Sequence, residues 1–235
     1  MARISRKELK TDTFALEVEH TVTFFEEHKQ DLVRYGGIAL AVAVLIVGYV
    51  FYSRHQHGKR ETALYHAIQV EESPVGPPQP GQSTTMNFPT QEAKDQVALK
   101  EFADVASAYS GSAEGEISQY YLGTIYADQG KLAEAEKSFK EVADKGDAKY
   151  ASLAKLSLAQ IYFADGRDNQ GTALLQDLIA HPTMFVSKEQ ATLTLARFLV
   201  RKNPTEARKL LDPLRSQPGV VGQTALGMYS ELPPQ

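Results

Sequence analysis

The side chains of this chain that could do chemistry are histidines, serines and carboxylates, and their spacing decides what chemistry is available. Six histidines occur, and the closest pair is His55 and His57. A zinc site would need further ligands in a fixed geometry, so these two are interpreted as solvated side chains. The serines and carboxylates form no nucleophile elbow, no glycine-rich phosphate loop and no paired-acid arrangement. We therefore predict a protein that is not an enzyme, with no metal and no cofactor.

Composition excludes further classes of partner. The formal net charge is -4 and the isoelectric point is about 5.9, so the chain lacks the basic surface that nucleic-acid binding requires. The absence of cysteine excludes disulfides, thiolate metal sites and a cysteine nucleophile. It also excludes a cysteine that carries a lipid anchor. We expect neither nucleic acid nor a small-molecule substrate.

An uncharged apolar run, residues 35–52, is the element that dominates the amino-terminal part of the chain. Its 18 residues would form a helix about 27 Å long, which reaches across the hydrocarbon core of a bilayer. A buried core helix is the alternative, but such helices are usually shorter or carry a polar stripe. The leader of 34 residues is too long for a cleaved signal, and no small-x-small pair follows the run. The sequence predicts an uncleaved transmembrane helix in contact with lipid.

Basic residues on the two sides of the run predict its orientation. Six lysines and arginines precede it and three follow it within the short flanks, namely Arg3, Arg6, Lys7, Lys10, Lys29 and Arg34 against Arg54, Lys59 and Arg60. The positive-inside rule then favours a cytoplasmic amino terminus and an extracytoplasmic remainder. Close to the run the counts are nearly even, so the opposite topology stays an alternative.

The remaining segments differ in composition. Residues 1–34 form a tail in which an amphipathic helix is expected, and residues 53–72 continue as a juxtamembrane helix. Residues 73–90 are rich in proline and glycine and predict a loop. Residues 91–235 follow as a domain with helical patterning.

Helical stretches repeat along the chain. YLGTIYADQGKLAEAEKSF, LAQIYFADGRDNQGTALL and LARFLVRKNPTEARKLL align, and Phe139, Leu175 and Leu211 are spaced by 36 residues. Each copy predicts two helices joined by a short turn, with a small residue four positions before a large one in the second helix. An earlier copy is split, because its helices over 62–71 and 91–109 flank the proline-rich loop. The repeated residues are therefore interpreted as core residues that determine the architecture and do not take part in chemistry.

This pattern resembles the tetratricopeptide repeat, most closely over Leu122, Gly123, Tyr126, Ala135 and Phe139. The resemblance implies an all-α fold, in which a single transmembrane helix precedes a solenoid of helical hairpins, and a concave surface that binds other proteins. The family's groove positions fall on Tyr120, Thr124, Leu156, Gln160, Phe163, Leu193, Arg197 and Val200.

These groove residues lack the lysine and asparagine that grip a terminal carboxylate in some repeats of this kind. A mixed apolar and polar groove suits an amphipathic helix or an unfolded segment instead. Tyr120 and Phe163 are the leading candidate anchors, and burial between helices is the alternative explanation for both.

The order of parts, FFEEHKQDL, then the run beginning GGIALAVAV, then SRHQHGKRETALYHA and the repeats, resembles the YfgM family. Its members are bacterial inner-membrane proteins whose periplasmic domain associates with the Sec translocon and a membrane-anchored chaperone. The resemblance implies an accessory factor with translocon subunits, a periplasmic chaperone or exported polypeptides as partners. Alternatives are a scaffold for cell-envelope assembly or division, and an adaptor that faces the cytoplasm.

Overall fold

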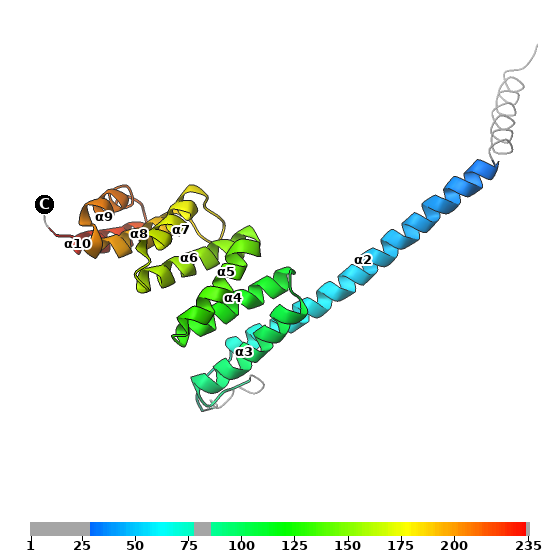
Figure 1. The fold of residues 1–235 in the computed structure, drawn as a ribbon, viewed down its shortest axis with the longest axis horizontal. Helices are drawn as coiled ribbons and strands as arrows, with labels where there is room; N and C mark the ends of the chain where they lie inside the picture. The colour runs from blue at the N-terminus through cyan, green and yellow to red at the C-terminus, as the bar shows by residue number, and fades with distance from the viewer. Residues whose placement is uncertain (1–28, 78–85, 234–235) are drawn as a thin grey trace, which may run out of the picture. The chain divides into compact units, whose positions relative to one another are not determined.

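The computed structural model describes residues 29–77 and 86–233, so most of the tail helix expected over 1–34 lies outside the described residues. Within these ranges the chain is helical and contains no β-strand, which confirms the predicted all-α fold class. Figure 1 shows the helices in order. They are α2 (Lys29–Glu71), α3 (Gln91–Ala108), α4 (Ala113–Asp128), α5 (Leu132–Lys145), α6 (Ala148–Ala164), α7 (Asp168–Ala180), α8 (Lys188–Lys202), α9 (Pro204–Leu211) and α10 (Val220–Ser230).

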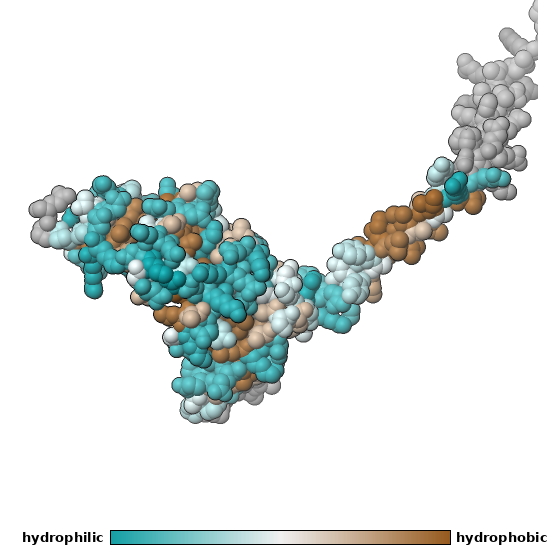
Figure 2. All heavy atoms as spheres, in the orientation of Figure 1, coloured by the Kyte–Doolittle hydropathy of each residue, from teal (hydrophilic) through white to brown (hydrophobic). Residues whose placement is uncertain are grey.

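The chain divides into two compact units, Met1–Gly58 and Lys59–Gln235. In the first unit, the side chains of α2 from Val33 to His55 are all exposed, and none of this apolar segment is buried within the described structure. Figure 2 shows it as a hydrophobic segment of the helix. By length and composition α2 can cross a membrane, because apolar side chains exposed all round a helix suit lipid and not water.

The second unit begins with the split hairpin. Ala67 and Val70 near the end of α2 have no exposed surface, and neither have Ala98 and Phe102 of α3. These residues share one core cluster, so the last turns of α2 pack with α3 although the loop separates them in sequence.

The two ends of that loop are fastened to each other. Val75 and Phe88 form an isolated parallel bridge, in which the Gly76 amide donates to the Phe88 carbonyl oxygen (2.9 Å) and the Phe88 amide donates to the Pro74 carbonyl oxygen (3.1 Å). Thr90 then caps α3 by accepting from the Ala93 amide. The hairpin therefore starts again at a fixed point after the loop.

Turns at equivalent places join the helices of each later hairpin. Gly130 and Gly166 both have a φ of 73°, a left-handed conformation that glycine adopts without strain. The Asn203 side chain accepts from the Glu206 amide (3.2 Å) and Pro204 occupies the first turn of α9. Asn203 therefore caps α9, and Pro204 occupies a position where its missing amide hydrogen costs nothing.

The predicted pairing of small and large residues forms the core of each hairpin. The small members Ala98, Ala135 and Ala207 have no exposed surface, and the large members Phe102, Phe139, Leu175 and Leu211 are at most 2% exposed. Gly171 takes the place of alanine in the α6–α7 hairpin because the Phe163 ring lies where its Cβ would be, 2.6 Å from Phe163 Cε1. The glycine is a steric requirement of the aromatic ring in this copy.

Polar bridges connect each second helix to the end of the next first helix. Gln129 after α4 donates to Asp95 of α3 (3.1 Å), and Lys202 of α8 pairs with Asp168 of α7. Arg167 after α6 donates through both terminal nitrogens to Glu136 of α5, at 2.9 and 2.5 Å. Neighbouring hairpins are therefore joined by hydrogen bonds at one edge as well as by apolar packing.

The bridge at Glu136 predicts a pH-dependent contribution to stability. Hydrogen bonds from Arg167, and then from Lys140, outweigh the effect of burial and lower the pKa of Glu136 from 4.5 to about 2. Because the folded pKa is depressed, the stabilisation is present above about pH 4.5 and is lost as the pH falls toward 2. A partly exposed charged hydrogen bond contributes about 1 kcal/mol, which is a Tm difference of about 2–4 °C.

Thermal unfolding of the wild type and of Glu136→Gln between pH 6 and pH 2 measures this contribution. The variant should melt lower at pH 6, and the gap should close at the acid end. A gap of constant size over the whole range would contradict the role of the Glu136 charge.

The last helix closes the stack. Helix α10 packs against α8 and α9, and Ala225 and Met228 join their core cluster. Two guanidinium groups lie over the Tyr229 ring, with Arg215 at 3.9 Å and Arg208 at 4.8 Å from its centre.

Candidate protein-interaction surface

The predicted groove residues differ in how much surface they offer. Gln160 and Arg197 are exposed, whereas Tyr120, Thr124, Phe163 and Leu193 are half-buried. Leu156 and Val200 are 8% and 7% exposed and belong to the core clusters of the last two hairpins. These two side chains lie in the packing between helices, so little of either is available to a partner. A binding role for the eight residues stays a prediction.

The two leading anchors are both packed against neighbouring helices. The Phe163 ring stacks on Phe198 of α8, with 3.6 Å between ring centres, and it also covers Gly171. The Tyr120 ring contacts Phe139 of α5 and Tyr150 of α6, at 5.6 and 5.7 Å between centres. Both side chains therefore hold helices together, and each leaves only part of its ring at the surface.

Tyr120 belongs to a continuous line of aromatic rings. We define the aromatic row as Tyr121, Tyr120, Tyr150 and Phe185, whose successive centres are 6.0, 5.7 and 5.5 Å apart in edge-to-face geometry. Its first ring stacks on the buried Phe102 at 4.8 Å. The row thus runs from α4 over the start of α6 to the loop before α8, anchored in the core at one end.

Tyr121 and Tyr150 of the row keep their hydroxyl protons at neutral pH. Partial burial raises the pKa of Tyr121 and of Tyr150 above the ordinary value of 10.0. Within the described part of the chain, the hydroxyls of Tyr120, Tyr121 and Tyr150 make no hydrogen bond. They are therefore free to donate to, or accept from, a molecule bound on the row.

Sequence reasoning found Tyr120 but missed Tyr150 and Phe185. Neither occupies a position that the repeat pattern marks, because Tyr150 lies at the start of its helix and Phe185 lies in a loop. The signal that was available is the stretch PTMFVS, 182–187, in which two large apolar residues sit side by side within a turn.

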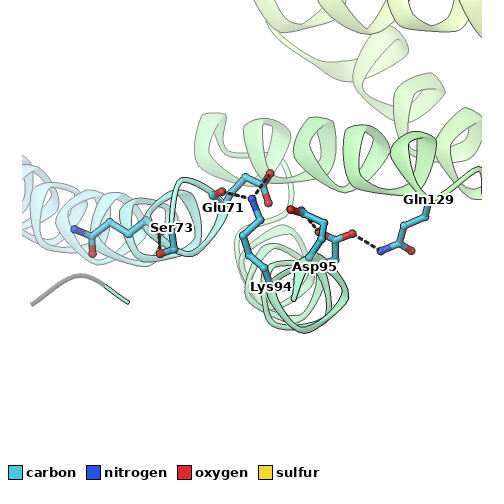
Figure 3. Close-up of polar contacts among 7 residues, drawn as sticks. Glu71, Ser73, Lys94, Asp95 and Gln129 are labelled. Atoms are coloured by element: carbon cyan, nitrogen blue, oxygen red, sulfur yellow. Dashed lines mark hydrogen bonds and ion pairs between the residues drawn. The ribbon is translucent and has the colours of Figure 1, made fainter. Parts of the chain in front are cut away.

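A second polar cluster, which does not include residues of the aromatic row, fixes the end of α2 against α3. Lys94 Nζ donates to the Glu71 carbonyl oxygen (2.6 Å), the kind of partner a helix end requires, and lies 3.5 Å from Glu71 Oε1. Figure 3 shows this contact beside that of Asp95 with Gln129. Burial raises the pKa of the Glu71 carboxyl, and the Lys94 ammonium opposes the rise. The network is a structural clamp.

Among the described residues we find neither a hollow of the size that cofactors occupy nor a cluster of metal ligands. A hollow of about 100 Å³ lies at the ends of α3 and α5 and the start of α4, lined by Ala106, Gly115, Glu116 and Val142 among others. Cofactor pockets are typically several times larger. No group of three histidine or carboxylate side chains suitable for a metal occurs among the residues that the structure describes.

A known protein family matches this chain. A sequence profile described as a tetratricopeptide repeat-like domain matches residues 24–191, well over half of the 235 residues. The chain belongs to the tetratricopeptide repeat-like domain family. No curated protein and no solved structure matches it.

Membership of this family indicates the general role of the repeat domain. Tetratricopeptide repeat-like domains are protein-interaction scaffolds and are generally not catalytic. The matched region includes the apolar helix and ends at the start of α8, so the closing helices α9 and α10 lie beyond it. Helix α9 nevertheless keeps the same buried pair of a small residue, Ala207, and a large one, Leu211.

Proposed function

We propose that the protein is a membrane-anchored scaffold that binds other proteins beside the secretion machinery, without catalysing a reaction. The observation that carries the proposal is one helix, α2, whose exposed apolar part can cross a membrane and whose last turns belong to a tetratricopeptide repeat-like domain. Such a chain brings a protein-binding surface to a membrane.

The short connection between the apolar run and the repeat domain limits how far from the membrane the protein-binding surface can lie. Between Tyr52, the last residue of the apolar run, and Leu64, the first buried residue of the repeats, lie eleven residues. Even a fully extended chain of that length spans only about 40 Å. The partners we propose are therefore proteins found at a membrane surface.

The excess of basic residues before the apolar run supports a periplasmic repeat domain anchored in a bacterial inner membrane. Together with the YfgM-like order of parts, it supports translocon subunits, a periplasmic chaperone and exported polypeptides as partners. In this proposal the protein is an accessory factor of the Sec translocon, which holds newly exported chains near chaperones.

Crosslinking of the full-length protein in intact membranes, followed by mass spectrometry of the captured proteins, tests the proposed function. We expect translocon subunits and a periplasmic chaperone. Recovery of division or peptidoglycan-assembly proteins without translocon subunits would instead support an envelope scaffold, and recovery of no protein would refute a scaffold role.

The orientation has an independent test. Alkaline phosphatase fused after Gln235 should be active, because that enzyme matures only outside the cytoplasm. A fluorescent protein that folds only in the cytoplasm should stay dark at the same position. The reverse pair of results would establish an adaptor that faces the cytoplasm.

A further inference from the structure

The loop between α7 and α8, residues 181–187, carries two large apolar side chains at the surface, and we call it the rim loop. Met184 is 84% exposed and Phe185 is 38% exposed. Met184 is the most exposed large apolar side chain of the described residues, above every side chain of the apolar run. An apolar side chain in that position gains nothing for the fold, because burial is the source of its stabilising effect.

The rim loop is held in one conformation although its apolar side chains face outward. Thr183 Oγ1 accepts from the Phe185 amide (3.3 Å) and the Val186 amide (3.1 Å), and lies 2.7 Å from Ser152 Oγ of α6. The Thr183 amide donates to the Val186 carbonyl oxygen (2.9 Å), and the Val186 side chain is fully buried. The exposure of Met184 is therefore built into the loop by its neighbours.

The rim loop continues the aromatic row. Phe185 lies edge-on to Tyr150, 5.5 Å between ring centres, and Tyr150 in turn contacts Tyr120. The combined surface has a soft thioether at one end, aromatic rings along its length and tyrosine hydroxyls without partners in the described chain. Rings and thioethers contact apolar side chains of many shapes, and hydroxyls hydrogen-bond a peptide backbone.

We infer that the aromatic row and the rim loop together bind an extended polypeptide segment with apolar side chains, an inference that rests on the proposed scaffold function. The preformed loop favours binding because little conformational freedom is lost when a partner docks. Rings 5.5 to 6.0 Å apart contact one another and form a continuous strip, along which a strand-like segment can place the alternate side chains of one face.

The charges next to this surface argue against a lipid surface as the occupant. Asp147 and Lys149 precede Tyr150, Lys188 and Glu189 follow the rim loop, and Glu71 and Glu72 lie near Tyr121. Binding to anionic lipid headgroups requires a cluster of basic residues instead. An aromatic surface without a cluster of basic residues fits a polypeptide segment better than an anionic lipid surface.

Fluorescence anisotropy of a labelled peptide measures this binding directly. The probe is a 14-residue fluorescein-labelled peptide that alternates leucine with serine and glycine, and the protein is the full-length chain in lipid nanodiscs. We expect Met184→Ser with Phe185→Ser to weaken the affinity at least about tenfold, as loss of central anchors does. The matched control is Val220→Ser with Leu226→Ser, two exposed apolar residues of α10, which should bind as the wild type does.

Three outcomes would overturn the inference. They are a wild-type protein that does not bind the peptide, a rim-loop variant that binds it with unchanged affinity, and an equal loss in the α10 variant. Unchanged thermal unfolding of both variants excludes misfolding as the cause.

A photoreactive benzoylphenylalanine in place of Met184 identifies the occupant. Adducts with the peptide support the inference, whereas adducts only with lipid, or only with a second copy of the chain, contradict it. The crosslinking in membranes separates this test from that of the function. If partners are captured equally by the wild type and the rim-loop variant, the scaffold function stands and only this surface is wrong.

Discussion

Replacing Phe139 with alanine should lower the free energy of unfolding by about 3–5 kcal/mol. The Phe139 ring is 2% exposed, contacts the Tyr120 ring and lies so close to Gly123 that a Cβ there would be 2.7 Å from it. Deleting the ring leaves a cavity among α4, α5 and α6, and the backbone at Gly123 carries no side chain that could fill it. Urea unfolding of the full-length protein in detergent, followed by circular dichroism, measures the loss.

The same chemical change at Phe185 is the matched control. That ring is 38% exposed and touches one aromatic neighbour, so Phe185→Ala should cost less than about 1.5 kcal/mol. Equal losses for the two variants would show that Phe139 is not the centre of its hairpin's core.

The second large effect concerns the apolar run of α2. Arginine in place of both Val44 and Leu45, two exposed residues near its middle, should abolish membrane insertion. Each charge at the centre of a transmembrane helix costs roughly 2.5–3.5 kcal/mol, so two together exceed the margin by which such a helix inserts. After alkaline extraction, the wild type should sediment with the membranes, and less than about a tenth of the variant should do so.

Arginine in place of Val220 and Leu226 of α10 adds the same charge to the repeat domain and should leave the protein in the membrane fraction. If the Val44 and Leu45 variant also stayed there, the apolar run would not be the anchor.

The sequence was sufficient to predict the class of fold because its signals are local. The turn glycines and the Asn203–Pro204 cap each act within one hairpin, and the 36-residue spacing of Phe139, Leu175 and Leu211 repeats that hairpin along the chain. The family match and the all-helical structure confirm the repeats. The split first hairpin could also be predicted from the sequence, because prolines and glycines interrupt an otherwise helical pattern.

The binding surface was harder to predict than the fold. An apolar residue in a solenoid either packs between helices or contacts a partner, and the repeat pattern does not distinguish the two roles. Leu156 fits the groove pattern, yet its neighbours Leu175 and Leu195 bury it. Phe163 fits as well, but it fills the space above Gly171, which no pattern within one helix reveals. Met184 and Phe185 lie outside every repeat position, and only the hydrogen bonds of Thr183 show that their loop is fixed.

The bridge between Val75 and Phe88 gives this protein a site where its length can change. The bridge already joins the two ends of the loop. The packing of α2 with α3 therefore does not depend on how many residues lie between Val75 and Phe88. The entropy cost of a longer loop grows only with the logarithm of its length. An affinity tag or a fluorophore placed there should therefore leave the repeats intact.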